Sequence, residues 1–174
     1  MHEQERLNAL KVALNNETRE REFYLKNARR TRNEVGRTMF LHIADEELEH
    51  YERLNQLHAK WEKSEKWPET VPLKVKDTIV KDVLKYAIRA LERKPEKEDD
   101  DLKAIRTAID FEENGSLHYA KLRDEVSDPK EKDFFDLLAK IEHEHFLSLK
   151  DTEEYLTNPA SWYTKTEHHI LDGA

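Results

Sequence analysis

An internal repeat most tightly constrains how this chain can fold. Residues 10–54 align with residues 105–149 without a gap, and ten aligned pairs are identical. About three identities are expected by chance at this composition. The identical pairs are Ala13/Ala108, Glu17/Glu112, Tyr24/Tyr119, Lys26/Lys121, Phe40/Phe135, Ala44/Ala139, Glu47/Glu142, Glu49/Glu144, His50/His145 and Leu54/Leu149. The chain is therefore expected to contain two copies of one structural unit.

Each copy has the pattern of a pair of long helices. Apolar residues recur at spacings of three and four over residues 7–32, 35–61, 101–125 and 129–156, as on one face of an amphipathic helix. Of the 174 residues, 39% are charged and 3 are Gly, and the abundant Glu, Lys, Leu and Ala favour helix. The basic cluster at 28–32 suits a helix C-terminus, and Ser127 or Asp128 suits the cap of the fourth helix.

A long connection separates the two copies. Residues 64–74 include Pro68 and Pro72 and read as a loop, whereas residues 75–94 have a shorter helical pattern. We therefore predict an all-α fold, a four-helix bundle over residues 1–157 with a long crossover that contains a short helix. Residues 158–174 are predicted to form a tail whose aromatic residues dock on the bundle. Trp61, Trp67 and Trp162 read as packing anchors.

Both copies carry a Glu-x-x-His pair, and a Glu followed seven residues later by Tyr. The residues concerned are Glu17, Tyr24, Glu47 and His50 in the first copy and Glu112, Tyr119, Glu142 and His145 in the second. These spacings place each set on one helix face, and that face is the apolar one. Ionised carboxylates that point into a bundle are costly unless they are paired or bound to a cation. Carboxylate and imidazole ligands favour a pair of iron or manganese ions.

Other function classes fit poorly. The net charge of −8 disfavours nucleic-acid binding, and the absence of Cys excludes thiolate sites and a cysteine nucleophile. No apolar run is long enough to span a membrane, and the N-terminus does not resemble a secretory signal, so we expect a cytoplasmic protein. No phosphate-binding Gly-rich loop or Ser/His/Asp pattern is evident.

The order of these motifs resembles the rubrerythrin family over about residues 5–157, and residues 162–174 are also similar to it. The resemblance implies a ferritin-like bundle whose two iron ions reduce hydrogen peroxide. Zinc or nickel can replace the working metal in a purified sample. Tyr24 and Tyr119 would donate hydrogen bonds to the ligand carboxylates and orient them, the alternative being two ordinary core tyrosines.

Two departures from the rubrerythrin pattern matter. Rubrerythrins usually carry a rubredoxin domain with paired Cys-x-x-Cys, and this chain has no Cys, so an external donor such as a rubredoxin-like protein is expected. They also carry an extra ligand Glu three residues after the Glu of the third helix, where this chain has Gly115. The repeat partner of Gly115 is Glu20, three residues after Glu17. Our hypothesis is that Glu20 supplies the extra carboxylate.

Two alternative functions stay open at this point. One is an iron-handling protein that oxidises ferrous iron with oxygen, and the other is a metal-stabilised bundle without redox turnover. The resemblance also implies a homodimer, sometimes with exchanged helices, for which the segment around Pro68 and Pro72 would be the crossing point. The remaining residues with possible ligand atoms are assigned to packing, to the flanks or to solvent: His42, His58, His118, His143, Glu144, His168 and His169.

Overall fold

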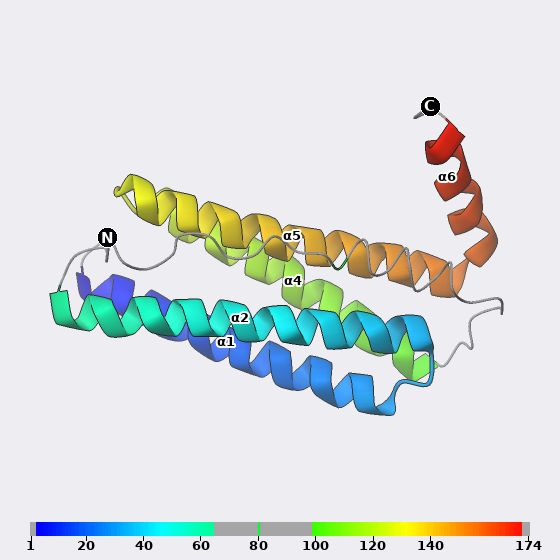
Figure 1. The fold of residues 1–174 in the computed structure, drawn as a ribbon, viewed down its shortest axis with the longest axis horizontal. Helices are drawn as coiled ribbons and strands as arrows, with labels where there is room; N and C mark the ends of the chain where they lie inside the picture. The colour runs from blue at the N-terminus through cyan, green and yellow to red at the C-terminus, as the bar shows by residue number, and fades with distance from the viewer. Residues whose placement is uncertain (1–2, 65–79, 81–98, 172–174) are drawn as a thin grey trace.

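Four long helices and one short helix make up the part of the chain that the structure describes. The structure is a computed structural model and describes residues 3–64, 80 and 99–171. The helices are α1 (Glu3–Arg30), α2 (Glu34–Ser64), α4 (Asp99–Glu125), α5 (Pro129–Thr157) and α6 (Pro159–Leu171). Within each repeat the two helices run antiparallel, and the two pairs lie side by side along one axis (Figure 1). The predicted four-helix fold is confirmed.

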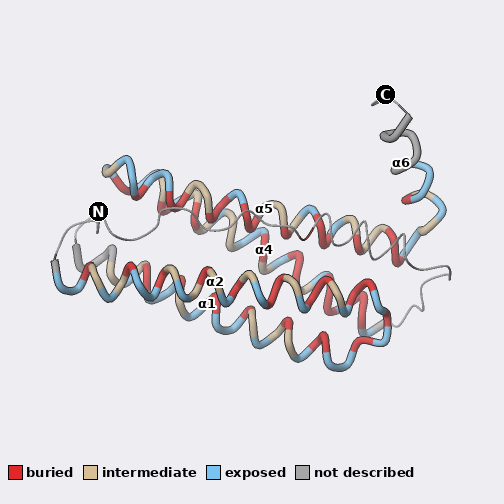
Figure 2. The backbone as a smooth tube through the Cα atoms, in the orientation of Figure 1, coloured by how far each residue is buried: buried red, intermediate tan, exposed pale blue. Residues whose placement is uncertain are grey.

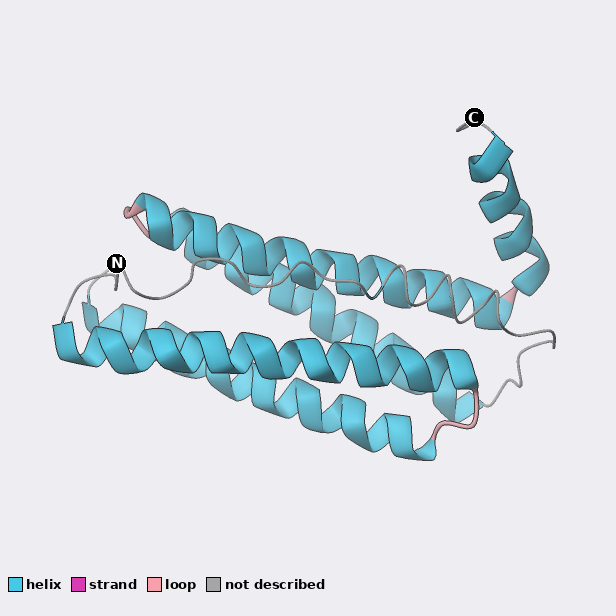
Figure 3. Cartoon of the chain, in the orientation of Figure 1, coloured by secondary structure: helices cyan, strands magenta, loops and turns pink. Residues whose placement is uncertain are grey.

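Short loops join the paired helices (Figure 3), and a polar side chain caps the helix that follows each loop. The Oδ1 atom of Asn33 accepts the backbone N–H of Gly36 at 3.0 Å, which caps the start of α2. Asp128 caps α5 by accepting the backbone N–H of Lys130 at 2.8 Å, and Pro129 follows it in the first turn. Of the two predicted caps for this helix, the structure uses Asp128.

The core consists of two apolar clusters, one toward each end of the bundle, and the buried faces of the four helices turn toward one another (Figure 2). On α1, Leu10 and Ala13 belong to one cluster and Tyr24 belongs to the other. The intervening inward positions are Glu17 and Glu20. The repeat therefore places its acidic residues between the two apolar clusters, which shield the middle of the bundle from water.

The C-terminal segment is a helix, which the sequence analysis did not predict. Asn158 accepts the backbone N–H of Ser161 at 3.2 Å, and Pro159 begins α6, so the start signal is a polar cap followed by Pro. Trp162 is buried and packs edge-on against Tyr155 of α5, with ring centroids 5.6 Å apart.

Several predictions lie outside the described residues. They are residues 65–74 of the predicted loop, with Trp67, Pro68 and Pro72, the short helix at 75–94 apart from residue 80, and the side chains of His168 and His169. Ser64, which was predicted to begin the loop, is the last residue of α2. Within the connection the structure describes Val80, which is buried in the cluster that contains Tyr24. The described helices include none that is long and apolar enough to cross a bilayer.

Candidate metal centre

Six side chains from four helices converge between the two apolar clusters. All six were predicted as ligands, and each is at most 2% exposed: Glu17 from α1, Glu47 and His50 from α2, Glu112 from α4, and Glu142 and His145 from α5. They form two overlapping groups, in each of which the potential ligand atoms lie within 4.8 Å of one another. The His50 group contains Glu17, Glu47, His50 and Glu142, and the His145 group contains Glu47, Glu112, Glu142 and His145.

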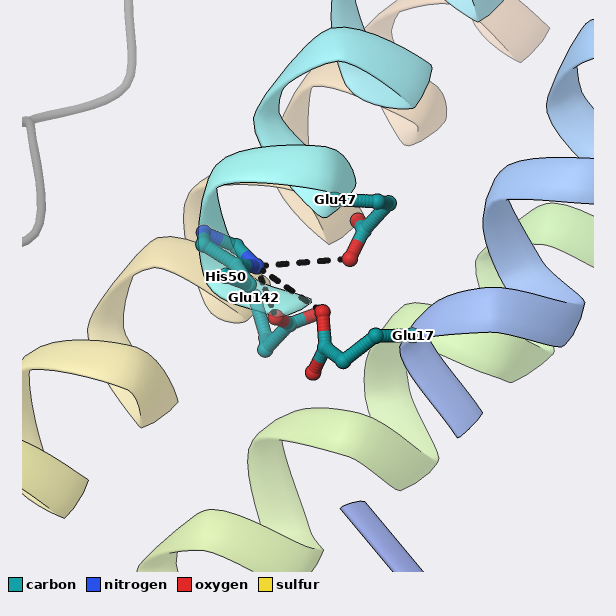
Figure 4. A group of neighbouring side chains, drawn as sticks. All are labelled: Glu17, Glu47, His50 and Glu142. Carbon is teal, nitrogen blue, oxygen red and sulfur yellow. Dashed lines mark hydrogen bonds and ion pairs between the residues drawn. The ribbon is translucent and has the colours of Figure 1, made fainter. Parts of the chain in front are cut away.

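In the His50 group, one imidazole nitrogen faces three carboxylates (Figure 4). Nδ1 of His50 lies 3.2 Å from Oε2 of Glu17, 3.3 Å from Oε2 of Glu47 and 3.2 Å from Oε1 of Glu142. A single N–H can point well at only one of these oxygens. Atoms that bind one cation at 2.0–2.2 Å are separated from each other by about 3.0–3.5 Å, so this spacing fits a shared ion.

The His145 group repeats the arrangement in the other half. Nδ1 of His145 lies 3.3 Å from Oε2 of Glu112 and 3.4 Å from Oε1 of Glu47. The two imidazole rings are nearly parallel, with centroids 5.9 Å apart. Glu47 and Glu142 belong to both groups, so each is placed to bridge two ions.

The donor set fits two divalent cations. The six residues include four Glu and no Lys or Arg, and two divalent ions would balance the charge of four ionised carboxylates. Oε2 of Glu142 is buried without a hydrogen-bond partner among the described residues, although a buried carboxylate oxygen normally has one. A cation at this position would satisfy that oxygen and remove the repulsion between the carboxylates.

Two tyrosines link the repeats reciprocally. The hydroxyl of Tyr24 on α1 donates to Oε1 of Glu112 on α4, and the hydroxyl of Tyr119 on α4 donates to Oε1 of Glu17 on α1. Each bond leaves the other oxygen of the same Glu beside a histidine. Both tyrosines are at most 2% exposed. These contacts are the ones predicted for residues that orient ligand carboxylates.

The pKa shifts reflect carboxylates crowded together in a dry site. Burial and the nearby Glu47 raise the pKa of Glu17 to about 8, and burial with Glu47 and Glu112 raises the pKa of Glu142. Burial alone would lower the pKa of both imidazoles. The carboxylates around them outweigh burial and raise the pKa of His50 and of His145. Protons that neutralise such a cluster leave when metal binds.

The comparison with protein families agrees with this geometry. The family model described as Rubrerythrin matches residues 8–153, which include all six predicted ligands. The chain belongs to the rubrerythrin family. No curated protein and no solved structure matches it significantly. Buried carboxylate and imidazole groups able to hold metal are therefore found at the centre of a rubrerythrin bundle.

The departure from the rubrerythrin pattern at residues 20 and 115 has a structural counterpart. Glu20 is buried, and burial followed by the charges of Glu47, Glu112 and Glu17 raises its pKa to about 10. At Gly115, an added Cβ would lie 3.2 Å from Oε2 of Glu142. Glu20 is not part of either group of potential ligand atoms.

Sequence reasoning missed one residue beside the ligands. Nε2 of His145 lies 2.7 Å from Oε2 of Glu46, a half-buried carboxylate on α2. Glu46 precedes the ligand Glu47, and the helical rotation of about 100° between them places it away from the inward face. Only the approach of α5 brings it to His145. His143 is exposed and Glu144 is half-buried, as predicted for the flank of α5.

Proposed function

We propose that this rubrerythrin binds two iron ions and reduces hydrogen peroxide to water with electrons from an external donor. The observation that carries the proposal is the pair of overlapping four-residue groups that share Glu47 and Glu142. Two metal positions with common carboxylates suit a reaction that uses two metals together. Manganese fits the same ligands, and the family favours iron.

The chemistry is a two-electron reduction. Peroxide loses its O–O bond, takes up two electrons and two protons, and leaves as two water molecules. When bound, two ferrous ions supply one electron each. The protein fixes the ligands: Tyr24 and Tyr119 hold one oxygen of Glu112 and of Glu17 and leave the other oxygen directed at the cluster. The apolar clusters on both sides keep bulk water out.

After each turnover, the oxidised iron must be reduced again by electrons from a separate donor. The chain has no Cys with which to hold a rubredoxin-type iron, so we assign the role of donor to a separate rubredoxin-like protein. A homodimer, with or without exchanged helices, is also part of the proposal. A measurement of molecular mass in solution tests the dimer, and a closed shell of many subunits would instead favour iron storage.

A peroxide assay tests the proposed reaction. Protein loaded anaerobically with ferrous iron is mixed with peroxide or with oxygen, and oxidation is followed by absorbance. We expect peroxide to oxidise the bound iron faster than oxygen does, and faster than peroxide oxidises free ferrous iron. The His145→Ala variant should lose this reaction, and the matched variant His143→Ala, which changes an exposed residue on the same helix, should keep it. Faster oxidation by oxygen would contradict peroxide reduction and favour iron handling.

We also propose that Glu20 is an additional ligand. Its side chain is buried, it lies on the inward face of α1, and Glu47 and Glu112 raise its pKa more than Glu17 does. Glu20→Ala should change the metal content or the rate of peroxide turnover, whereas Glu22→Ala on the same helix should change neither. Unchanged values for Glu20→Ala would contradict this assignment.

A further inference from the structure

The two metal positions differ in one contact that the repeat does not reproduce. The short contact between Nε2 of His145 and Oε2 of Glu46 spans α5 and α2. The residue that aligns with Glu46 in the second copy is Ile141, which is buried and cannot accept a hydrogen bond. Ile141 therefore cannot give His50 the contact that Glu46 gives His145.

The contact fixes how His145 presents its ring. An ionised carboxylate accepts hydrogen bonds, so Nε2 of His145 carries the proton that points at Glu46. Nδ1 then directs its lone pair to the side where Glu47 and Glu112 lie. A carboxylate behind an imidazole fixes the ring orientation and makes the other nitrogen a stronger donor to a metal.

We propose that Glu46 is a positioning residue for His145 and that it makes the two metal positions unequal, so that the His145 group binds its ion first and more tightly. This inference rests on the proposed binding of two metal ions. Losing such an outer carboxylate typically weakens metal binding by about 10–100-fold. The effect is expected at one of the two positions only.

A stepwise titration measures this inequality. Metal-free protein is titrated with Co²⁺ under anaerobic conditions, and binding is followed by absorbance and by calorimetry. In the wild-type chain we expect two steps whose affinities differ by about tenfold or more. In Glu46→Gln and Glu46→Ala the first step should weaken by about tenfold or more, with the larger loss in Ala, while the second step stays unchanged.

The matched control is Glu49→Gln. Glu49 also lies on α2, is half-buried, and faces Arg53 at 3.8 Å, so the variant removes the same charge without touching His145. We expect wild-type titration steps from it. Equal weakening by Glu49→Gln and Glu46→Gln would show a general charge effect and overturn the proposal.

A second readout detects the contact itself. In the diamagnetic Zn²⁺-loaded protein, proton NMR should show a slowly exchanging Nε2–H resonance from His145 that disappears in Glu46→Ala and persists in Glu49→Gln. A wild-type chain that binds no Co²⁺ contradicts the proposed function itself. A wild-type chain that binds two ions, with the same two steps in Glu46→Ala, contradicts only the role of Glu46.

Discussion

The two helix pairs, α1 with α2 and α4 with α5, agree at the ligands and differ just beside them. Each pair supplies a single Glu, a Glu-x-x-His pair and a Tyr that bonds to the Glu of the other pair. Around this shared set, the first pair has the buried Glu20 where the second pair has Gly115, and Glu46 contacts the ligand His145 where the second pair has Ile141.

This comparison separates the residues that provide the ligands from the residues that distinguish one metal position from the other. The shared residues fix the number of carboxylates, their burial and the spacing that two cations need, and equivalent changes in the two pairs should have equivalent effects on their own groups. Both unshared acidic residues come from the first pair, and one of them, Glu46, contacts a histidine of the His145 group. Duplication thus accounts for the symmetric part of the centre, and two acidic residues on α1 and α2 make its two positions different.

The largest expected effect is the loss of a histidine from either half. His50→Ala and His145→Ala each remove the only nitrogen donor of one group. We expect the iron content to fall from two ions to one or fewer. Peroxide turnover should fall by more than about 100-fold, which exceeds the usual 10–100-fold effect of losing an outer contact. Metal analysis and the peroxide assay measure both quantities.

The exposed His143 serves as the control for this pair of variants. If His50→Ala kept two tightly bound ions, the His50 group would not be a metal position and the comparison between the halves would fail.

The stability of the metal-free protein should depend on pH in a direction set by the raised pKa values. The pKa of Glu17 rises from 4.5 to about 8, so between these values the folded chain binds more protons than the unfolded chain. The free energy of unfolding therefore falls as the pH rises through that window. Glu20 and the two histidines act in the same direction.

Thermal unfolding checks this prediction. We expect the Tm of chelator-treated protein to fall by about 10 °C or more from pH 5 to pH 8, because the shift of Glu17 alone is worth roughly 3–4 kcal/mol over this range and each kcal/mol shifts Tm by about 2–4 °C in a chain of this size. Added Zn²⁺ should raise Tm most at pH 8, where the ligands lose their protons most easily. Glu20→Gln should flatten the pH dependence. If the Tm of the metal-free protein rose from pH 5 to pH 8, the buried carboxylates would not be raising one another's pKa.

The tyrosines should have smaller and equal effects, because their contacts are reciprocal. Tyr24→Phe removes the donor to Glu112, and Tyr119→Phe removes the donor to Glu17. We expect each to lower metal affinity by about tenfold, the low end for an outer contact. Exposed Tyr163 provides the control as Tyr163→Phe. Unequal losses would show that the halves differ at the tyrosines as well.

The sequence predicted the symmetric part of this centre, and of the two asymmetric residues it pointed to Glu20 and missed Glu46. Glu17, Glu47 and their repeat partners could be found because the repeat and the helical period place them on inward faces without any knowledge of how the pairs meet. The contact of Glu46 with His145 joins two helices that are distant in sequence, and the position of Glu46 on α2 predicts only a flank. The helix at Pro159–Leu171 was missed although Asn158 and Pro159 form a recognisable start.

The smallest predicted effect concerns Gly115, where the second pair lacks a side chain. In Gly115→Ala the new Cβ would lie 3.2 Å from Oε2 of Glu142, so this bridging carboxylate must shift by a few tenths of an ångström. We expect a loss of about threefold in metal affinity, below the 10-fold low end for an outer contact. Helix stability should rise, since Ala is favoured over Gly by about 1 kcal/mol.

The matched control for that variant is Gly36→Ala at the start of α2. Its Cβ would lie 3.3 Å from Cγ2 of Thr31, an equally close contact that involves no predicted ligand. Both variants gain helix propensity, so calorimetry with Co²⁺ can separate a change in metal binding from a change in stability. If the two variants bound Co²⁺ equally well, the lack of a side chain at Gly115 would have no role in metal binding. A loss confined to Gly115→Ala would mean that metal binding needs the close approach of Glu142 that Gly115 allows.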